Sequence, residues 1–178
     1  MAPEVARRLG LPHGAPPQVR ALVAPGERVL AWSADPAGAP LVASTRALYL
    51  VGDGGARERL PYEQVATATW QAPLLEVVTV GPARRRIVVR MDQPGRVPAT
   101  VRDRVTASVV LSEHVALVGE AGAQITARRQ PAPSASPGAE PDKVSWNVVF
   151  DPGLDPADPQ VRTAADRAIE RLRATTGL

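Results

Sequence analysis

The stretch that decides the fold runs Arg28-Val-Leu-Ala-Trp-Ser-Ala34, breaks at Asp35-Pro-Ala-Gly38, and resumes as Leu41-Val-Ala-Ser-Thr-Arg-Ala-Leu-Tyr-Leu50. Short apolar runs that end at turn residues are typical of β-strands. Four further runs follow, over 57–60, 64–70, 75–80 and 86–91. The glycine-rich segment 52–55 can adopt positive φ at little cost, which predicts a hairpin turn. Seven short strands at this spacing predict a bent antiparallel sheet or a partly open barrel.

The segment that follows the meander fits two structures. Val101, Val105 and Val109 recur at helical spacing, but they also occupy alternate positions, and β-branched residues favour strands. The preceding Pro98 and the intervening charges favour a helix over 99–110, with a strand as the open alternative. Farther on, 115–118 and 124–129 read as strands around a glycine turn, and the alternating apolar residues of 144–151 predict another strand.

The C-terminus carries the clearest helical pattern, over 158–176. Asp158 is a good N-cap and Pro159 suits the first helical position. One side of the helix is apolar, and we expect it to cap the β scaffold. Residues 1–18 read as a flexible tail and 130–143, rich in Pro, Ala and Ser, as a flexible loop. The remaining chain, 19–178, suits a single α+β domain that is mostly β.

Composition excludes several classes of protein. The 178 residues include no cysteine, which leaves no disulfide framework, thiolate nucleophile or zinc ribbon. The net charge at pH 7 is only +3 although the pI is about 10.1, because arginine dominates the basic residues and stays protonated to high pH. Neither a signal peptide nor a membrane-spanning apolar run is evident, so we expect a cytoplasmic protein.

Three short motifs resemble bacterial pleckstrin-homology-like domains. They are Pro25-Gly-Glu-Arg-Val-Leu-Ala-Trp32, the hairpin Leu41-Val-Ala-Ser-Thr-Arg-Ala-Leu-Tyr-Leu50, and Leu60-Pro-Tyr-Glu-Gln-Val65. The similarity covers 25–91. Downstream segments extend it to uncharacterised actinobacterial proteins that carry such a domain. The resemblance implies a seven-strand bent sheet capped by a C-terminal helix, but no activity, since the fold hosts lipid, peptide and protein binding alike.

Family members that bind phosphoinositides place basic residues in the loop between the first two strands. Here that loop, 35–40, carries Asp35 and no base, which disfavours a phosphoinositide headgroup. The candidate contacts for an anion or an acidic partner are instead two arginine clusters, Arg84, Arg85 and Arg86, and Arg128 and Arg129. Their alternative role is that of solvated turn residues. Nucleic-acid binding is disfavoured because the aromatic residues sit at expected core positions and leave no stacking platform.

No constellation of residues points to catalysis. His114 lies near Asp103, Ser108 and Ser112 in sequence, but no nucleophile-elbow motif accompanies it. Two isolated histidines do not make a metal site, and the Asp- and Pro-rich connector from Asp151 to Asp158 reads as structural. We therefore predict a non-enzymatic binding or scaffolding protein without cofactor, acting through protein–protein contacts. The alternative is weak association with an anionic membrane or nucleic acid through 84–86. The oligomeric state stays open.

Overall fold

The computed structural model describes residues 15–51, 56–81, 84–129 and 144–178, which form two compact units. The first comprises the described residues up to Ser108, and the second comprises 109–129 and 144–178. The structure thus differs from the single domain predicted for 19–178. The predicted loop 130–143, the turn 52–55 and the tail residues 1–14 lie outside the described residues.

The first unit contains the predicted seven-strand meander as two antiparallel sheets. One sheet has the order β1 (Val29–Ala34), β2 (Pro40–Ser44), β3 (Ala47–Val51), β4 (Arg57–Pro61). After the short turn η4 (Tyr62–Gln64), the other has the order β5 (Val65–Gln71), β6 (Leu74–Thr79), β7 (Arg86–Arg90). No ladder joins the two sheets in the described part of the chain, so the expected barrel is not closed.

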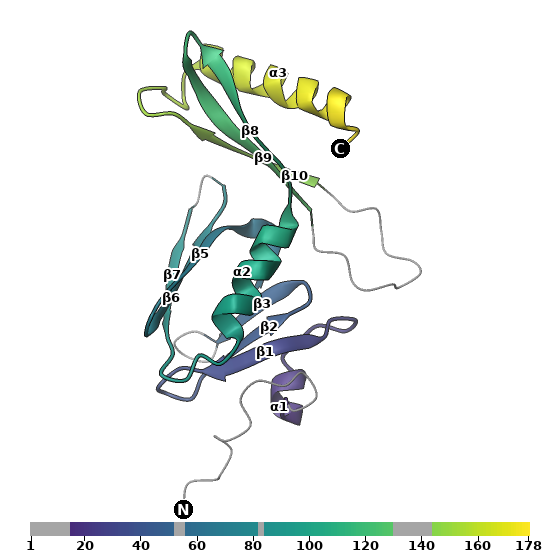
Figure 1. Ribbon diagram of the computed structural model, residues 1–178, viewed down its shortest axis with the longest axis vertical. Coiled ribbons are helices and arrows are strands. Elements are labelled where there is room, and N and C mark those ends of the chain that lie inside the picture. Colours follow the sequence, from purple (N-terminus) through teal and green to yellow (C-terminus); the bar gives the residue numbers. More distant parts are fainter. Residues whose placement is uncertain (1–14, 52–55, 82–83, 130–143) are drawn as a thin grey trace, which may run out of the picture. The chain divides into compact units, whose positions relative to one another are not determined.

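Helix α2 (Val97–Ser108) follows β7 and packs against β5, η4, β1 and β2 (Figure 1). Its buried residues Val97, Val101 and Val105 recur every fourth position and join a core drawn from both sheets. The helix predicted over 99–110 is confirmed, two residues earlier than expected. It also corrects the expected packing, because α2 and not the C-terminal helix covers these sheets.

The four-stranded sheet is buried on its second face as well. Short helix α1 (Pro17–Arg20) contributes Val19 to a smaller cluster with Ala15, Val42 and Tyr49. Strand alternation explains this, because Val42 and Tyr49 point away from the face that carries Leu41 and Leu48. The predicted tail 1–18 is wrong at its described end, since Ala15 is buried and Pro17 begins a helix.

Residues of the first two quoted motifs, together with Arg59 of β4, meet in a hydrogen-bonded network. The Glu27 side chain, only 3% exposed, accepts hydrogen bonds from the Arg59 guanidinium at 2.7 Å and from the Ser44 hydroxyl. The Arg28 amide donates to the Thr45 hydroxyl at 3.2 Å, and the Thr45 amide donates to the Arg28 carbonyl at 2.9 Å. The motifs therefore fix the start of β1 against the β2–β3 turn and β4.

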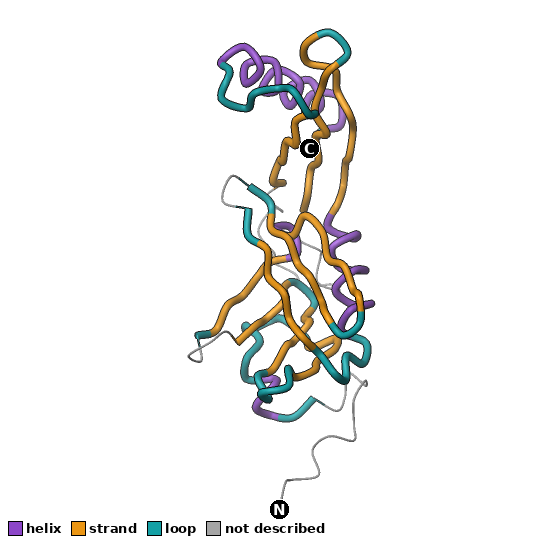
Figure 2. Tube along the Cα trace, turned by 90° about the vertical axis from the view of Figure 1, so that its left-hand side faces the viewer, coloured by secondary structure: helices purple, strands orange, loops and turns teal. Residues whose placement is uncertain are grey.

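The second unit is a three-stranded antiparallel meander with a helix on one face (Figures 1 and 2). Its sheet has the order β10 (Val144–Phe150), β9 (Ala121–Arg129), β8 (Val109–Val118). Helix α3 (Pro159–Thr176) begins as predicted, with the Asp158 side chain accepting from the Gln160 amide at 2.7 Å, and ends at Gly177 with φ of +69°. It packs on β8, and Val161, Ala165 and Ala168 are buried.

The phenol of Tyr62 supplies a pH-dependent part of the stability. Burial raises its pKa, and its hydroxyl donates to the Ser44 carbonyl at 3.1 Å. Because the folded-state pKa is raised, the neutral phenol's contribution is complete below the unfolded pKa of about 10 and is lost as pH rises above it. We expect the free energy of unfolding of Tyr62→Phe to fall less than that of wild type above about pH 10. Urea titrations across that range measure this, and identical pH profiles contradict it.

Candidate functional site

A groove of about 390 Å³ opens at one end of the first unit. Its wall includes the buried side chains of Leu41 and Leu50, together with Ile87 and Val89 of β7, which pack against the core. The remaining lining residues come from the β1–β2 turn and the first residue of β2 (Asp35, Pro36, Ala39 and Pro40), from the facing ends of β3 and β4 (Val51, Ala56 and Glu58), and from β7 itself (Val88 and Arg90). The groove is therefore an apolar slot with a few charges at its rim.

The β1–β2 turn at the rim is shaped by Asp35. Its carboxylate accepts from the Ala39 amide at 2.8 Å, and its carbonyl accepts from the Gly38 amide at 2.9 Å. Gly38 has φ of +87°, a conformation that side chains with a Cβ rarely adopt. The only charged side chain in this turn is thus an acid held in place by the backbone, as the sequence indicated.

The predicted cluster Arg84, Arg85 and Arg86 lies next to the groove, at the start of β7. Arg85 forms an ion pair with Glu58 of β4, and Arg86 lies 2.6 Å from Glu76 of β6. These hydrogen bonds raise the pKa of both guanidinium groups, and Arg86 lowers the pKa of the Glu76 carboxyl. Arg84 is exposed. The charge of two of the three arginines is therefore compensated by carboxylates from neighbouring strands.

The other predicted arginines, Arg128 and Arg129, end strand β9 in the second unit. Arg128 is buried, and burial lowers the pKa of its guanidinium; Arg129 is half-buried. The structure thus assigns the two clusters to different units. Arg128 has little surface to offer a binding partner.

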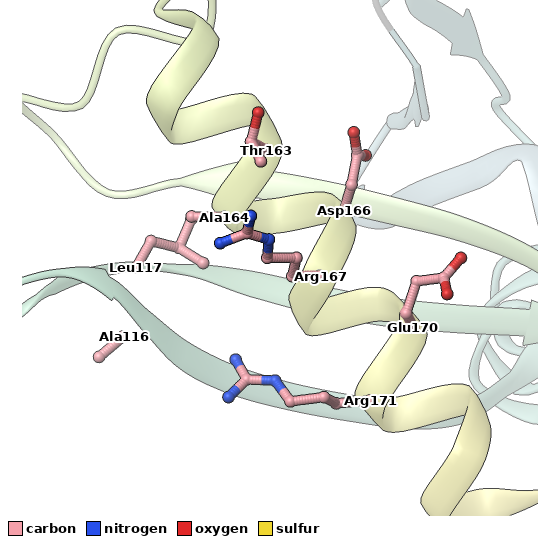
Figure 3. A pocket seen from close by; sticks show the side chains of 8 residues that line it. All are labelled: Ala116, Leu117, Thr163, Ala164, Asp166, Arg167, Glu170 and Arg171. Atoms are coloured by element: carbon pink, nitrogen blue, oxygen red, sulfur yellow. The ribbon is translucent and has the colours of Figure 1, made fainter.

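The sequence reasoning missed a second depression, of about 810 Å³, between α3 and the end of β8. In Figure 3, Arg167 and Arg171 extend toward Leu117 and Ala116 of β8, whereas Asp166 and Glu170 point to the other side of the helix. These arginines are four positions apart and so lie one turn apart. Neither forms an ion pair within the described residues. The spacing was visible in the sequence, but it reads equally as the solvated face of an amphipathic helix.

His114 pairs with Asp151, not with the Asp103 considered from the sequence. Its Nε2 lies 3.0 Å from the Asp151 carboxylate, which also accepts from the Gly122 amide at 2.7 Å. The hydrogen bond from the Gly122 amide is the main cause of a lowered pKa of the Asp151 carboxyl, and the hydrogen bond with His114 lowers this pKa further. Ser112 instead contacts Gln124 and Thr126, and Ser108 donates to the Val105 carbonyl. No serine–histidine hydrogen bond occurs in the described residues. The contact between His114 and Asp151 instead joins β8 to the residue that follows β10.

Two absences within the described residues bear on the site. No group of three or more His, Asp or Glu side chains comes together there as a metal site would require. None of the described helices is both long and apolar enough to span a lipid bilayer.

Comparisons with known proteins leave the site to be interpreted from its own geometry. No protein-family model, no curated protein and no solved structure matches this chain.

Proposed function

We propose that this chain is a non-catalytic binding protein whose first unit is a pleckstrin-homology-like module that contacts a protein partner. The support is the succession of four strands, three strands and a helix over the first unit, together with the motif residues that interlock at Glu27, Ser44 and Thr45. A fold of this kind hosts many functions, so the site has to carry the argument.

The observation that carries the proposal is the groove beside β7. Its floor is apolar, its rim is sparsely charged, and Val88 is 47% exposed at its edge. Apolar grooves with a few placed polar groups are typical binding sites. Arg90, at the same rim, forms an ion pair with Asp92 at 3.1 Å, which leaves little net charge there. The groove therefore suits an apolar side chain of a partner protein better than an anion.

The alternative is weak association with anionic membranes or nucleic acids through Arg84–Arg86. Exposed basic clusters bind such surfaces through the number of phosphates that they neutralise. Here the carboxylates of Glu58 and Glu76 already occupy two of the three guanidinium groups. The alternative has correspondingly less support.

A pair of matched variants tests the groove. We expect Val88→Arg to abolish partner binding, because it places a charged side chain across the apolar opening, whereas Val118→Arg in the second unit, at a similar exposure of 50%, leaves binding intact. The measurement is capture from extracts of the native cell on immobilised full-length protein, quantified by mass spectrometry. Proteins retained by wild type and Val118→Arg but lost with Val88→Arg are the predicted partners.

The outcomes separate the two functions. Equal capture by all three proteins contradicts the groove as the contact. Retention of phospholipid vesicles or nucleic acid that weakens strongly with salt, and is lost when Arg84, Arg85 and Arg86 are all replaced by serine, supports the alternative instead.

A further inference from the structure

Strand β10 differs from the other strands at the borders of the three sheets. An edge strand exposes unpaired backbone N–H and C=O groups, and proteins protect such strands with charges, prolines or bulges. Within the described ranges, six strands lie at the edge of a sheet: β1, β4, β5, β7, β8 and β10. Strands β1 and β5 each contain a bulge, and β8 has two register shifts and the charge of Glu113. Strands β4 and β7 carry charged side chains, at 57–59 in β4 and at Arg86 and Arg90 in β7.

None of these protections occurs in β10. Its sequence, Val144-Ser-Trp-Asn-Val-Val-Phe150, contains no charge and no proline, and its register with β9 is continuous over all seven residues. Valine, tryptophan and phenylalanine are also among the strongest strand formers. In the described residues β10 pairs with β9 alone, so its other backbone side has no strand partner there.

The register shows which backbone groups face outward. The Asp151 amide donates to the Gly122 carbonyl at 2.9 Å, which makes this the hydrogen-bonded kind of antiparallel pair. Such pairs alternate, so Ser145, Asn147 and Val149 bond to β9. The backbone N–H and C=O groups of the alternate residues therefore point away from β9, in the plane of the sheet. These residues are Val144, Trp146, Val148 and Phe150.

The side chains divide in the same way. Trp146, Val148 and Phe150 lie opposite the buried Ala127, Ile125 and Ala123 on one face of the sheet. The Arg173 guanidinium of α3 sits 5.5 Å from the centre of the Trp146 ring, so this face is the one that the helix covers. Ser145, Asn147 and Val149 occupy the opposite face, where Val149 is 59% exposed.

We propose that β10 pairs with β10 of a second copy of this chain, antiparallel, about a two-fold axis at Asn147. In this register Trp146 lies opposite Val148 of the other copy, and Val144 lies opposite Phe150. All four of these residues present outward N–H and C=O groups, so the Trp146–Val148 and Val144–Phe150 pairs can each exchange two hydrogen bonds. The two sheets then form one continuous six-stranded sheet with both copies of α3 on the same face.

The same register explains why the occupant is a second copy. A two-fold axis at Asn147 places this residue against its own copy and brings the rest of β10 against the same strand of the other copy, where like charges directly opposite each other are destabilising. Strand β10 has no charge to repel its own copy. Asn147 meets Asn147, whose amide is both donor and acceptor and can bond to its equivalent. Trp–Val and Phe–Val neighbours are favourable cross-strand pairs.

The test uses the full-length chain and a charge exchange at Asn147. We expect wild type to reach twice the 18.8 kDa chain mass in sedimentation equilibrium as its concentration rises. Asn147→Asp and Asn147→Lys should each weaken association roughly tenfold or more, because like charges oppose each other at the axis. An equimolar mixture of the two variants should regain the wild-type association, which a folding defect would not allow.

A matched control places the same charge two residues away. Val149→Lys lies on the same face of β10, but in this register it meets Ser145, so we expect its association to stay within about threefold of wild type. Hydrogen exchange gives a second readout, since the outward amides of Trp146 and Val148 should be protected in the wild-type dimer and exposed in Asn147→Asp. The proposal is overturned if wild type stays monomeric, if both Asn147 variants dimerise normally, or if their mixture fails to associate.

Discussion

Alanine at Tyr62 is expected to cost the first unit about 3–5 kcal/mol of its free energy of unfolding, which is most of what a small domain has. The ring is completely buried in η4, between the last strand of one sheet and the first strand of the other. It belongs to the core that both sheets share with α2, and its amide donates to the Arg46 carbonyl at 3.2 Å. Removing the ring leaves a cavity that neither sheet can close.

The matched control is Tyr62→Phe, which keeps the ring and removes only the hydroxyl that donates to Ser44. We expect a loss of about 1 kcal/mol, the usual net contribution of one hydrogen bond. Urea titration of wild type and the two variants measures the difference. A loss below about 1.5 kcal/mol for Tyr62→Ala would show that the corner between the sheets can repack around the missing ring.

The strands of the first unit were predictable because each is a short apolar run bounded by its own turn residues. The helix before β8 was predictable only with the help of its flanks, because the spacing of Val101, Val105 and Val109 fits a strand as well, and Pro98 and the intervening charges favoured the helix. What the helix at the C-terminus would cover was not predictable. An apolar stripe such as Val161, Ala165 and Ala168 shows that a face is buried but carries no information about its partner. The partner of α3 proved to be the local β8–β10 sheet, not the seven-strand meander of the first unit.

The candidate site illustrates the same limit for charges. The run Arg84–Arg86 stands out in the sequence, but its compensating acids do not, because Glu58 lies 27 residues from Arg85 and on a different sheet. Likewise the groove collects residues from the β1–β2 turn, β3, β4 and β7. Each segment alone reads as an ordinary turn or strand, so only their assembly forms a site.

Glutamate at Ala168 is expected to unfold the second unit and leave the first unit folded. Ala168 is on the buried side of α3, only one turn from Ala165, and has almost no exposed surface. Placing a carboxylate there without a partner costs about 3 kcal/mol or more, and a three-stranded sheet with one helix has little stability to spare. Arg167→Glu is the control, since it puts the same side chain on the neighbouring exposed position.

Hydrogen exchange with peptide resolution measures the outcome unit by unit. In Ala168→Glu the amides of β8, β9, β10 and α3 should lose protection, whereas those of β1–β7 and α2 should retain it. The reason is that the core of the first unit, as far as the described residues show it, is drawn from that unit alone. Arg167→Glu should match wild type throughout. If Ala168→Glu also exposed the amides of β2 and β3, the two units would have to share one cooperative transition, and two separate cores would no longer describe how this chain is stabilised.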